Sequence, residues 1–101
     1  MAAVTKRLAK GAVSTTSTSV YTVPAGTTTI IKAITVCNGG GSDHNLSMTI
    51  AGTAIIWNYK IKAYDTIAIP FLDHIIQAGE TITLFSTGTT TTYYISGKEV
   101  T

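Results

Sequence analysis

The stretch from residue 20 to residue 38, VYTVPAGTTTIIKAITVCN, restricts the possible folds more than any other part of the chain. Two segments rich in Thr, Val and Ile, Val20–Val23 and Thr28–Cys37, flank the turn-forming sequence Pro24-Ala25-Gly26. β-Branched residues favour strands, whereas Pro and Gly favour tight turns. The pattern therefore predicts a hairpin. Its second strand is apolar on both faces, so we expect a central strand with a core on one side and a second sheet or another subunit on the other.

The remaining sequence predicts further short strands. They are expected over Asn45–Ile50, Thr53–Ile61, Thr66–Phe71, Thr81–Ser86 and Thr91–Val100, with Leu72–Gln77 as a crossing segment. Ala51-Gly52 predicts a hairpin between the first two, and alternation places Ile55, Trp57, Tyr59 and Ile61 on one face. About eight short strands separated by turns are typical of an all-β sandwich or barrel.

The alternation also selects the residues that should form the core. These are Ile34, Val36, Leu46, Met48, Ile50, Ile55, Ile67, Ile69, Ile82, Leu84 and Ile95.

Charged residues make up only 12% of the 101-residue chain, about half the usual share, and the net charge is +2. The interpretation that we favour is a subunit whose apolar surface is buried in an assembly, and the alternative is an unusually threonine-rich monomer. The single cysteine, Cys37, excludes an intrachain disulfide. The N-terminal sequence lacks the apolar core of a secretory signal, which fits a protein that is made in a cytoplasm.

Residues 1–13 are expected to form an N-terminal arm or an edge strand ahead of a single β-sandwich domain over residues 14–101. This segment carries Lys6, Arg7 and Lys10 with no acidic residue nearby. The cluster fits either a solvated terminus or an arm that grips an acidic neighbour.

The sequence gives little support for catalysis, metal binding or nucleotide binding. His44 and His74 each follow an aspartate, but no metal-ligand spacing is present. The glycines at 39–41 lack the following Lys and helix of a phosphate loop, and no nucleophile elbow occurs. We therefore expect no enzyme activity, no metal and no cofactor. The dispersed basic residues also argue against nucleic-acid binding, and no apolar run is long enough to span a membrane.

Several motifs together resemble a known class of proteins. YTVPAGT and ITVCN are followed by AGETI and a closing YISGKE, and the resemblance covers residues 20–100. The chain resembles small β-sandwich virion structural proteins of tailed bacteriophages. The resemblance implies a jelly-roll-like two-sheet antiparallel sandwich, often trimeric, that sits on a capsid or tail.

Two functions remain open for a protein of this kind. The first is a capsid decoration (cement) protein in the virion that self-associates, most simply as a trimer, and binds other phage capsid or tail proteins. The second is a tail, neck or fibre-associated module that binds a glycan or receptor through exposed aromatic residues. Candidates for such stacking are Trp57, Tyr59, Tyr64, Tyr93 and Tyr94. Alternation favours Trp57 and Tyr59 as core or subunit contacts, and with Lys6, Arg7 and Lys10 they are the candidate partner-binding residues.

Overall fold

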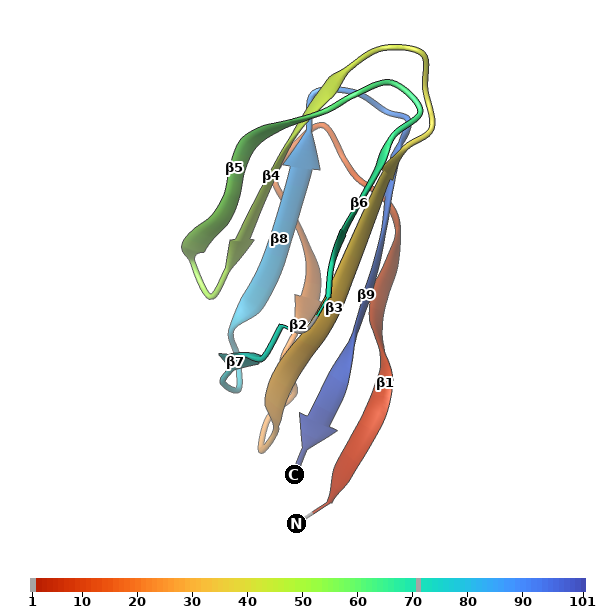
Figure 1. Ribbon diagram of the computed structural model, residues 1–101. Coiled ribbons are helices and arrows are strands. Elements are labelled where there is room, and N and C mark those ends of the chain that lie inside the picture. The colour runs from red at the N-terminus through yellow and green to blue at the C-terminus, as the bar shows by residue number, and fades with distance from the viewer. Residues whose placement is uncertain (1, 71) are drawn as a thin grey trace.

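The computed structural model describes residues 2–70 and 72–101, and within these ranges the chain forms nine strands in two antiparallel sheets (Figure 1). The strands are β1 (Ala3–Ala12), β2 (Thr18–Thr22), β3 (Thr28–Asn38), β4 (His44–Ile50), β5 (Thr53–Ile61), β6 (Thr66–Ile69), β7 (His74–Ile76), β8 (Thr81–Ser86) and β9 (Thr91–Val100). The expected all-β, two-sheet antiparallel sandwich is confirmed.

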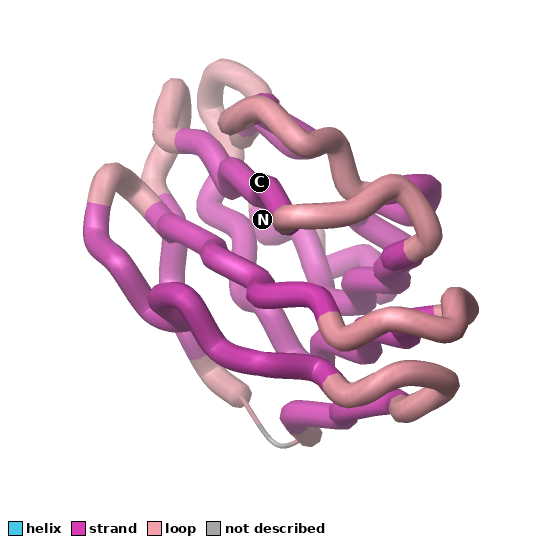
Figure 2. The backbone as a smooth tube through the Cα atoms, turned by 90° about the horizontal axis from the view of Figure 1, so that it is seen from above, coloured by secondary structure: helices cyan, strands magenta, loops and turns pink. Residues whose placement is uncertain are grey.

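Sheet A has the order β1-β9-β3-β6, with β7 also paired to β3, and sheet B has the order β2-β8-β4-β5. Viewed from above, the strands run along the sandwich and loops join them at its ends (Figure 2). The described residues contain no helix of the length and apolarity that a membrane crossing requires. The central position predicted for Thr28–Cys37 is correct, because β3 pairs with β9, β6 and β7.

The core lies between the two sheets and consists almost entirely of aliphatic side chains. Its buried members are Val13, Val23, Ile31, Ile34, Val36, Leu46, Met48, Ile50, Ile61, Ile76, Ile82, Leu84 and Ile95. Eight of the eleven predicted core residues belong to this set. Ile67 and Ile69 are only partly buried and pack against its margin, and Ile55 is exposed.

The hairpin predicted over residues 20–37 is wrong. β2 pairs with β8 in sheet B, whereas β3 lies in sheet A, so the Pro24 turn is an arch that carries the chain from one sheet to the other. Local turn chemistry is present, since the Thr27 amide donates to the Pro24 carbonyl over 3.2 Å. However, turn residues alone do not determine whether the flanking strands pair with each other or with strands of separate sheets.

The face predicted for β5 is also wrong, because the strand contains two irregularities. The β4–β5 hairpin itself is confirmed, but its register shifts between Leu46 and Met48 and again between Met48 and Thr49. Asn58 has a positive φ of 53°, and its amide donates to the Ser47 hydroxyl over 2.9 Å. At each shift β5 has one more residue than β4, and each extra residue reverses the side of the strand to which the following side chains point. Consequently Ile61 is buried and Tyr59, opposite the buried Leu46, lies on the same side of β5 at the exposed margin of the sandwich, whereas Ile55 and Trp57 are exposed.

Two further segments complete the sheets. Residues 3–12, for which the sequence left an arm or an edge strand open, form the edge strand β1 and pair with β9 along their length. The short strand β7 lies inside the segment that was expected only to cross between sheets. Phe71, the predicted end of the strand that begins at Thr66, falls outside the described residues.

Candidate interaction surfaces

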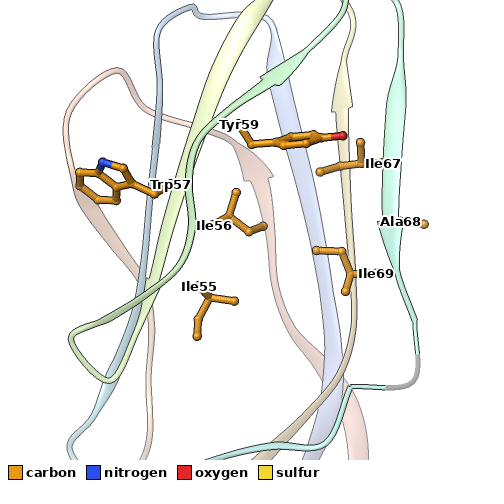
Figure 3. Close-up of a pocket in the computed structure, with 7 residues that line it drawn as sticks. All are labelled: Ile55, Ile56, Trp57, Tyr59, Ile67, Ala68 and Ile69. Atoms are coloured by element: carbon orange, nitrogen blue, oxygen red, sulfur yellow. The ribbon is translucent and has the colours of Figure 1, made fainter.

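An apolar groove lies on one flank of the sandwich, between β5 at the edge of sheet B and β6 at the edge of sheet A. Its volume is about 510 Å³. We call it the flank groove, and it is lined by Ile55, Ile56, Trp57, Tyr59, Ile67, Ala68 and Ile69 (Figure 3). The two sheets diverge here without a strand to close the edge, so the margin of the core meets solvent.

The flank groove exposes an unusual amount of large apolar side chain. Ile55 is 42% exposed and Tyr59 52%, and Trp57 adds a 64% exposed side chain whose ring lies on the other side of β5. In Figure 3 the Tyr59 ring lies between the two strands, with its hydroxyl toward Ile67. Single exposed apolar residues are normal on a monomer, but a contiguous patch of this kind marks a contact site.

The two strands beside the groove are poor templates for an added strand. Among the described residues β5 pairs only with β4, and it is interrupted by its two irregularities. β6 is four residues long and Pro70 follows it. Bulges and proline are the usual means of blocking edge-to-edge pairing. A partner would therefore contact the groove through side chains rather than through a continuous hydrogen-bonded ladder.

Trp57 and Tyr59 do not act as one pair. Figure 3 shows Tyr59 directed toward the groove and Trp57 directed to the opposite side of β5. The Trp57 ring meets the Phe85 ring edge to face, with centroids 5.8 Å apart and planes at 82°. This contact fixes Trp57 against sheet B while most of its surface remains accessible.

The three basic residues of β1 are also divided. Lys6 donates to Glu99 Oε1 over 3.2 Å, and Glu99 also accepts a hydrogen bond from Tyr21 of the other sheet. Arg7 and Lys10 lie opposite Ser96 and Tyr94 in the β1–β9 register. The Arg7 guanidinium lies 5.9 Å from the centre of the Tyr94 ring. Of the predicted cluster, only Arg7 and Lys10 therefore share a surface.

Sequence reasoning missed the second wall of the flank groove. Ile67 and Ile69 were assigned to the core, and Ala68 was not singled out. The only relevant signal was that Pro70 marks the β6 segment as an edge strand. That signal does not reveal which other edge faces it across the sandwich.

The described residues bring together no group of three or more His, Cys, Asp or Glu side chains that could hold a metal ion. The His44 ring contacts two hydroxyl groups, with Nδ1 3.1 Å from Thr91 Oγ1 and 3.4 Å from Thr90 Oγ1. These contacts attach β4 to the first residue of β9 and to the loop before it.

No protein-family model matches the sequence, and no curated protein matches it. Solved structures do resemble the fold. The Drosophila NLP core, whose crystal structure concerns pentamer formation and histone binding, superposes with a TM-score of 0.55 at 16% identity, covering 95% of this chain and 100% of that one. A chain of the T13 IBDV viral particle, an icosahedral virus, superposes with a TM-score of 0.59 at 13% identity.

The viral match covers 97% of this chain but 30% of the viral one, so the sandwich corresponds to part of a larger capsid polypeptide. Both likenesses concern the fold. They relate the chain to small sandwiches of the nucleoplasmin and viral jelly-roll kind.

Proposed function

We propose that this protein is a non-catalytic structural subunit of a tailed-bacteriophage particle, most simply a capsid decoration protein that self-associates and attaches to the outer shell. The flank groove is the observation that carries the proposal. It leaves Ile55 and Tyr59 exposed beside the half-buried Ile67 and Ile69, with Trp57 exposed on the other side of β5, on a chain with only 12% charged residues. Burial of such a surface between subunits would remove apolar area from water.

The architecture supports an assembly role. Sandwiches of this shape occur in a protein that forms pentamers and in an icosahedral virus particle. The phage-like motifs in residues 20–100 add a second, independent line of support. For the number of subunits we propose a trimer, which is the state that the phage resemblance implies.

The glycan-binding alternative receives less support from the arrangement of the aromatic rings. A sugar-stacking site needs aromatic faces that converge on one concavity. Trp57 and Tyr59 instead point to opposite sides of β5, and the flank groove is lined mainly by aliphatic side chains. We therefore prefer subunit contact as the role of this surface.

Electron microscopy of the native particle tests the proposal. A C-terminal tag on Thr101 can carry a gold label, since this residue is exposed. We expect label distributed over the head shell. Label confined to the tail or fibre tips would favour the glycan-binding alternative, and particles without label would overturn a virion role altogether.

A further inference from the structure

The outer face of sheet A gathers basic residues from the two ends of the sequence. In β9 the alternate residues Ile95 and Gly97 are buried, so Tyr94, Ser96 and Lys98, which alternate with them, point away from the core. The register then places Lys10 beside Tyr94, Arg7 beside Ser96, and Lys98 beside Ile30 on this outer surface. Lys98 lies 88 positions beyond Lys10 in the sequence, and only the β1–β9 pairing brings them onto one face.

We call the surface formed by Arg7, Lys10, Tyr94, Lys98 and Ile75 the basic face. Ile75 belongs to it because β7 pairs Ile75 with Ile30, while the next residue, Ile76, is buried. Backbone groups in the interior of this sheet are already paired. A partner that lies on this face, rather than along the free edge of β1, must therefore be recognised by these side chains.

The three basic side chains of the basic face belong to no ion pair in the described residues. The ion pairs in the described part of the chain are Lys6–Glu99, Lys32–Asp73 and Lys60–Asp43. None of them involves Arg7, Lys10 or Lys98. Asp73 lies near enough to Lys98 for that lysine to help lower its pKa, but Asp73 is already paired with Lys32, so the basic face and this pair together carry a charge of +3. The other three basic residues and the other four acidic residues leave the rest of the molecule at −1, which means that the small net charge of +2 conceals a polarised surface.

The composition of the basic face suits a protein partner. Tyr94 is 46% exposed and Ile75 61% exposed. Arginine and tyrosine together with exposed apolar area are typical of protein interfaces, whereas nucleic-acid interfaces are more polar and more strongly positive. The stacking of Arg7 on Tyr94 restricts the guanidinium while leaving its N–H groups able to bind a carboxylate.

We propose that the basic face binds an acidic, carboxylate-rich protein surface. Within the proposed function that surface belongs to another protein of the particle, while the flank groove joins copies of this chain. Three positive charges are few for a nucleic-acid site, which typically uses about 6–10 phosphate contacts. The attachment is steered by charge and weakens as salt rises.

Point substitutions test this proposal more cleanly than removal of the N-terminal segment, because deletion of β1 would uncover the edge of β9. The test variant is Lys10→Gln/Lys98→Gln. The matched control is Lys60→Gln/Lys62→Gln, which removes the same two charges away from the basic face. Binding of fluorescent poly-L-glutamate is measured by anisotropy at several salt concentrations, with a DNA duplex of equal charge as the competing probe.

We expect the wild type and the control to bind poly-L-glutamate similarly and the test variant to bind about tenfold more weakly at low salt. If both variants bound equally weakly, the loss of net charge alone would explain the effect, and the proposal would be overturned. Undetectable binding by the wild type would also overturn it. Tighter binding to DNA than to poly-L-glutamate would assign the basic face to nucleic acid instead.

Sedimentation of the same samples distinguishes failure of the proposed assembly from failure of this inference. A wild-type monomer that still binds through the basic face contradicts only the proposed assembly, and an oligomer that does not bind contradicts only this inference.

Discussion

At the scale of single residues, a small polar cluster ties the two sheets together near the chain ends. The Tyr21 hydroxyl of β2 lies 2.5 Å from Glu99 Oε2 and 2.7 Å from Thr29 Oγ1. The ionised carboxylate can only accept, so Tyr21 donates to Glu99 and accepts from Thr29. Lys6 completes the cluster through Glu99 Oε1. None of these contacts could be read from the sequence, because they join four different strands.

The first prediction concerns Tyr21→Phe. The substitution leaves the buried Thr29 hydroxyl without its acceptor and removes a donor from the Glu99 carboxylate. We expect the free energy of unfolding to fall by about 1–3 kcal/mol in urea denaturation. The matched control is Tyr93→Phe, whose hydroxyl makes no hydrogen bond within residues 2–70 and 72–101, and we expect a change within about 0.5 kcal/mol. Equal losses in the two variants would contradict the role given to this cluster.

Because of the same cluster, we expect the stability of the folded state to fall both at acidic and at alkaline pH. The hydrogen bond from Tyr21, followed by that from Lys6, holds the pKa of Glu99 below its ordinary 4.5. Near pH 4.5 the unfolded chain therefore binds more protons than the folded one. The stabilisation that Glu99 gives to the folded state is complete above about pH 4.5 and is lost as the pH falls. Burial, and then the bond to Glu99, raises the pKa of Tyr21 from 10.0 to about 12. The folded state therefore retains the phenolic proton, and stability declines between pH 10 and 12.

Denaturation midpoints of the wild type and of Tyr21→Phe across this pH range test both declines in stability. Other groups contribute to each curve, for example Asp73, whose pKa is lowered by Lys32, and Tyr93, whose pKa is raised by burial. The difference between the two proteins removes these contributions. We expect that difference to be largest between about pH 5 and 10 and to shrink on either side. A difference that is independent of pH would be inconsistent with the coupling.

At the scale of elements, local composition and turn chemistry were enough to locate most strands. Thr81–Ser86 and Thr91–Val100 have the predicted bounds, since Ile82 and Leu84 alternate with threonines in the first strand and the polar turn around Gly88 separates it from the second. Prediction failed where a strand departs from strict alternation or where its pairing depends on strands that are far away in the sequence. The irregularities of β5 depend on Ser47 of the neighbouring strand, and the sheet membership of β2 depends on β8, so neither is a local property.

Leu84→Ala and Ile55→Ala test the revised register of the sandwich. Leu84 is fully buried and Ile55 is 42% exposed, although alternation assigned both to the core. We expect Leu84→Ala to cost about 2–5 kcal/mol, because it leaves a cavity between the sheets. For Ile55→Ala we expect less than about 1 kcal/mol in the dissociated subunit. Comparable losses measured by urea denaturation at low protein concentration would show that β5 faces inward after all.

Gly97 should be the least replaceable glycine of the strands. It lies at the centre of sheet A, where the register of β3 against β9 shifts, and an added Cβ would meet the Ile30 carbonyl oxygen and approach Leu8 Cδ1 to 2.8 Å. Because the Ile30 backbone is held in the sheet and cannot shift without disrupting it, we expect Gly97→Ala to lower the free energy of unfolding by at least about 2 kcal/mol. Gly39→Ala is the control, since its Cβ would make only an ordinary 3.5 Å contact with the Thr90 carbonyl oxygen. Thermal melting of both variants provides the comparison, and a stable Gly97→Ala variant would refute the close packing.

At the scale of the whole molecule, the sequence identified residues of both candidate surfaces but not the surfaces themselves. Trp57 and Tyr59 stood out as large aromatic residues, yet the flank groove also needs Ile67 and Ile69 from the opposite sheet. Arg7 and Lys10 stood out as a basic cluster, but Lys98 seemed dispersed. The pairing of distant strands creates both surfaces, and residue spacing alone does not encode that pairing.

Sedimentation equilibrium at micromolar concentration tests the central claim, that the flank groove joins copies of this chain. We expect the wild type to sediment with three times the 10.6 kDa mass of one chain. Tyr59→Ser should weaken the association, while Tyr64→Ser should leave it unchanged, since Tyr64 is equally aromatic and 76% exposed but does not line the groove. A wild-type protein that sediments as a single 10.6 kDa species, or a Tyr64→Ser variant that dissociates as readily as Tyr59→Ser, would contradict the account.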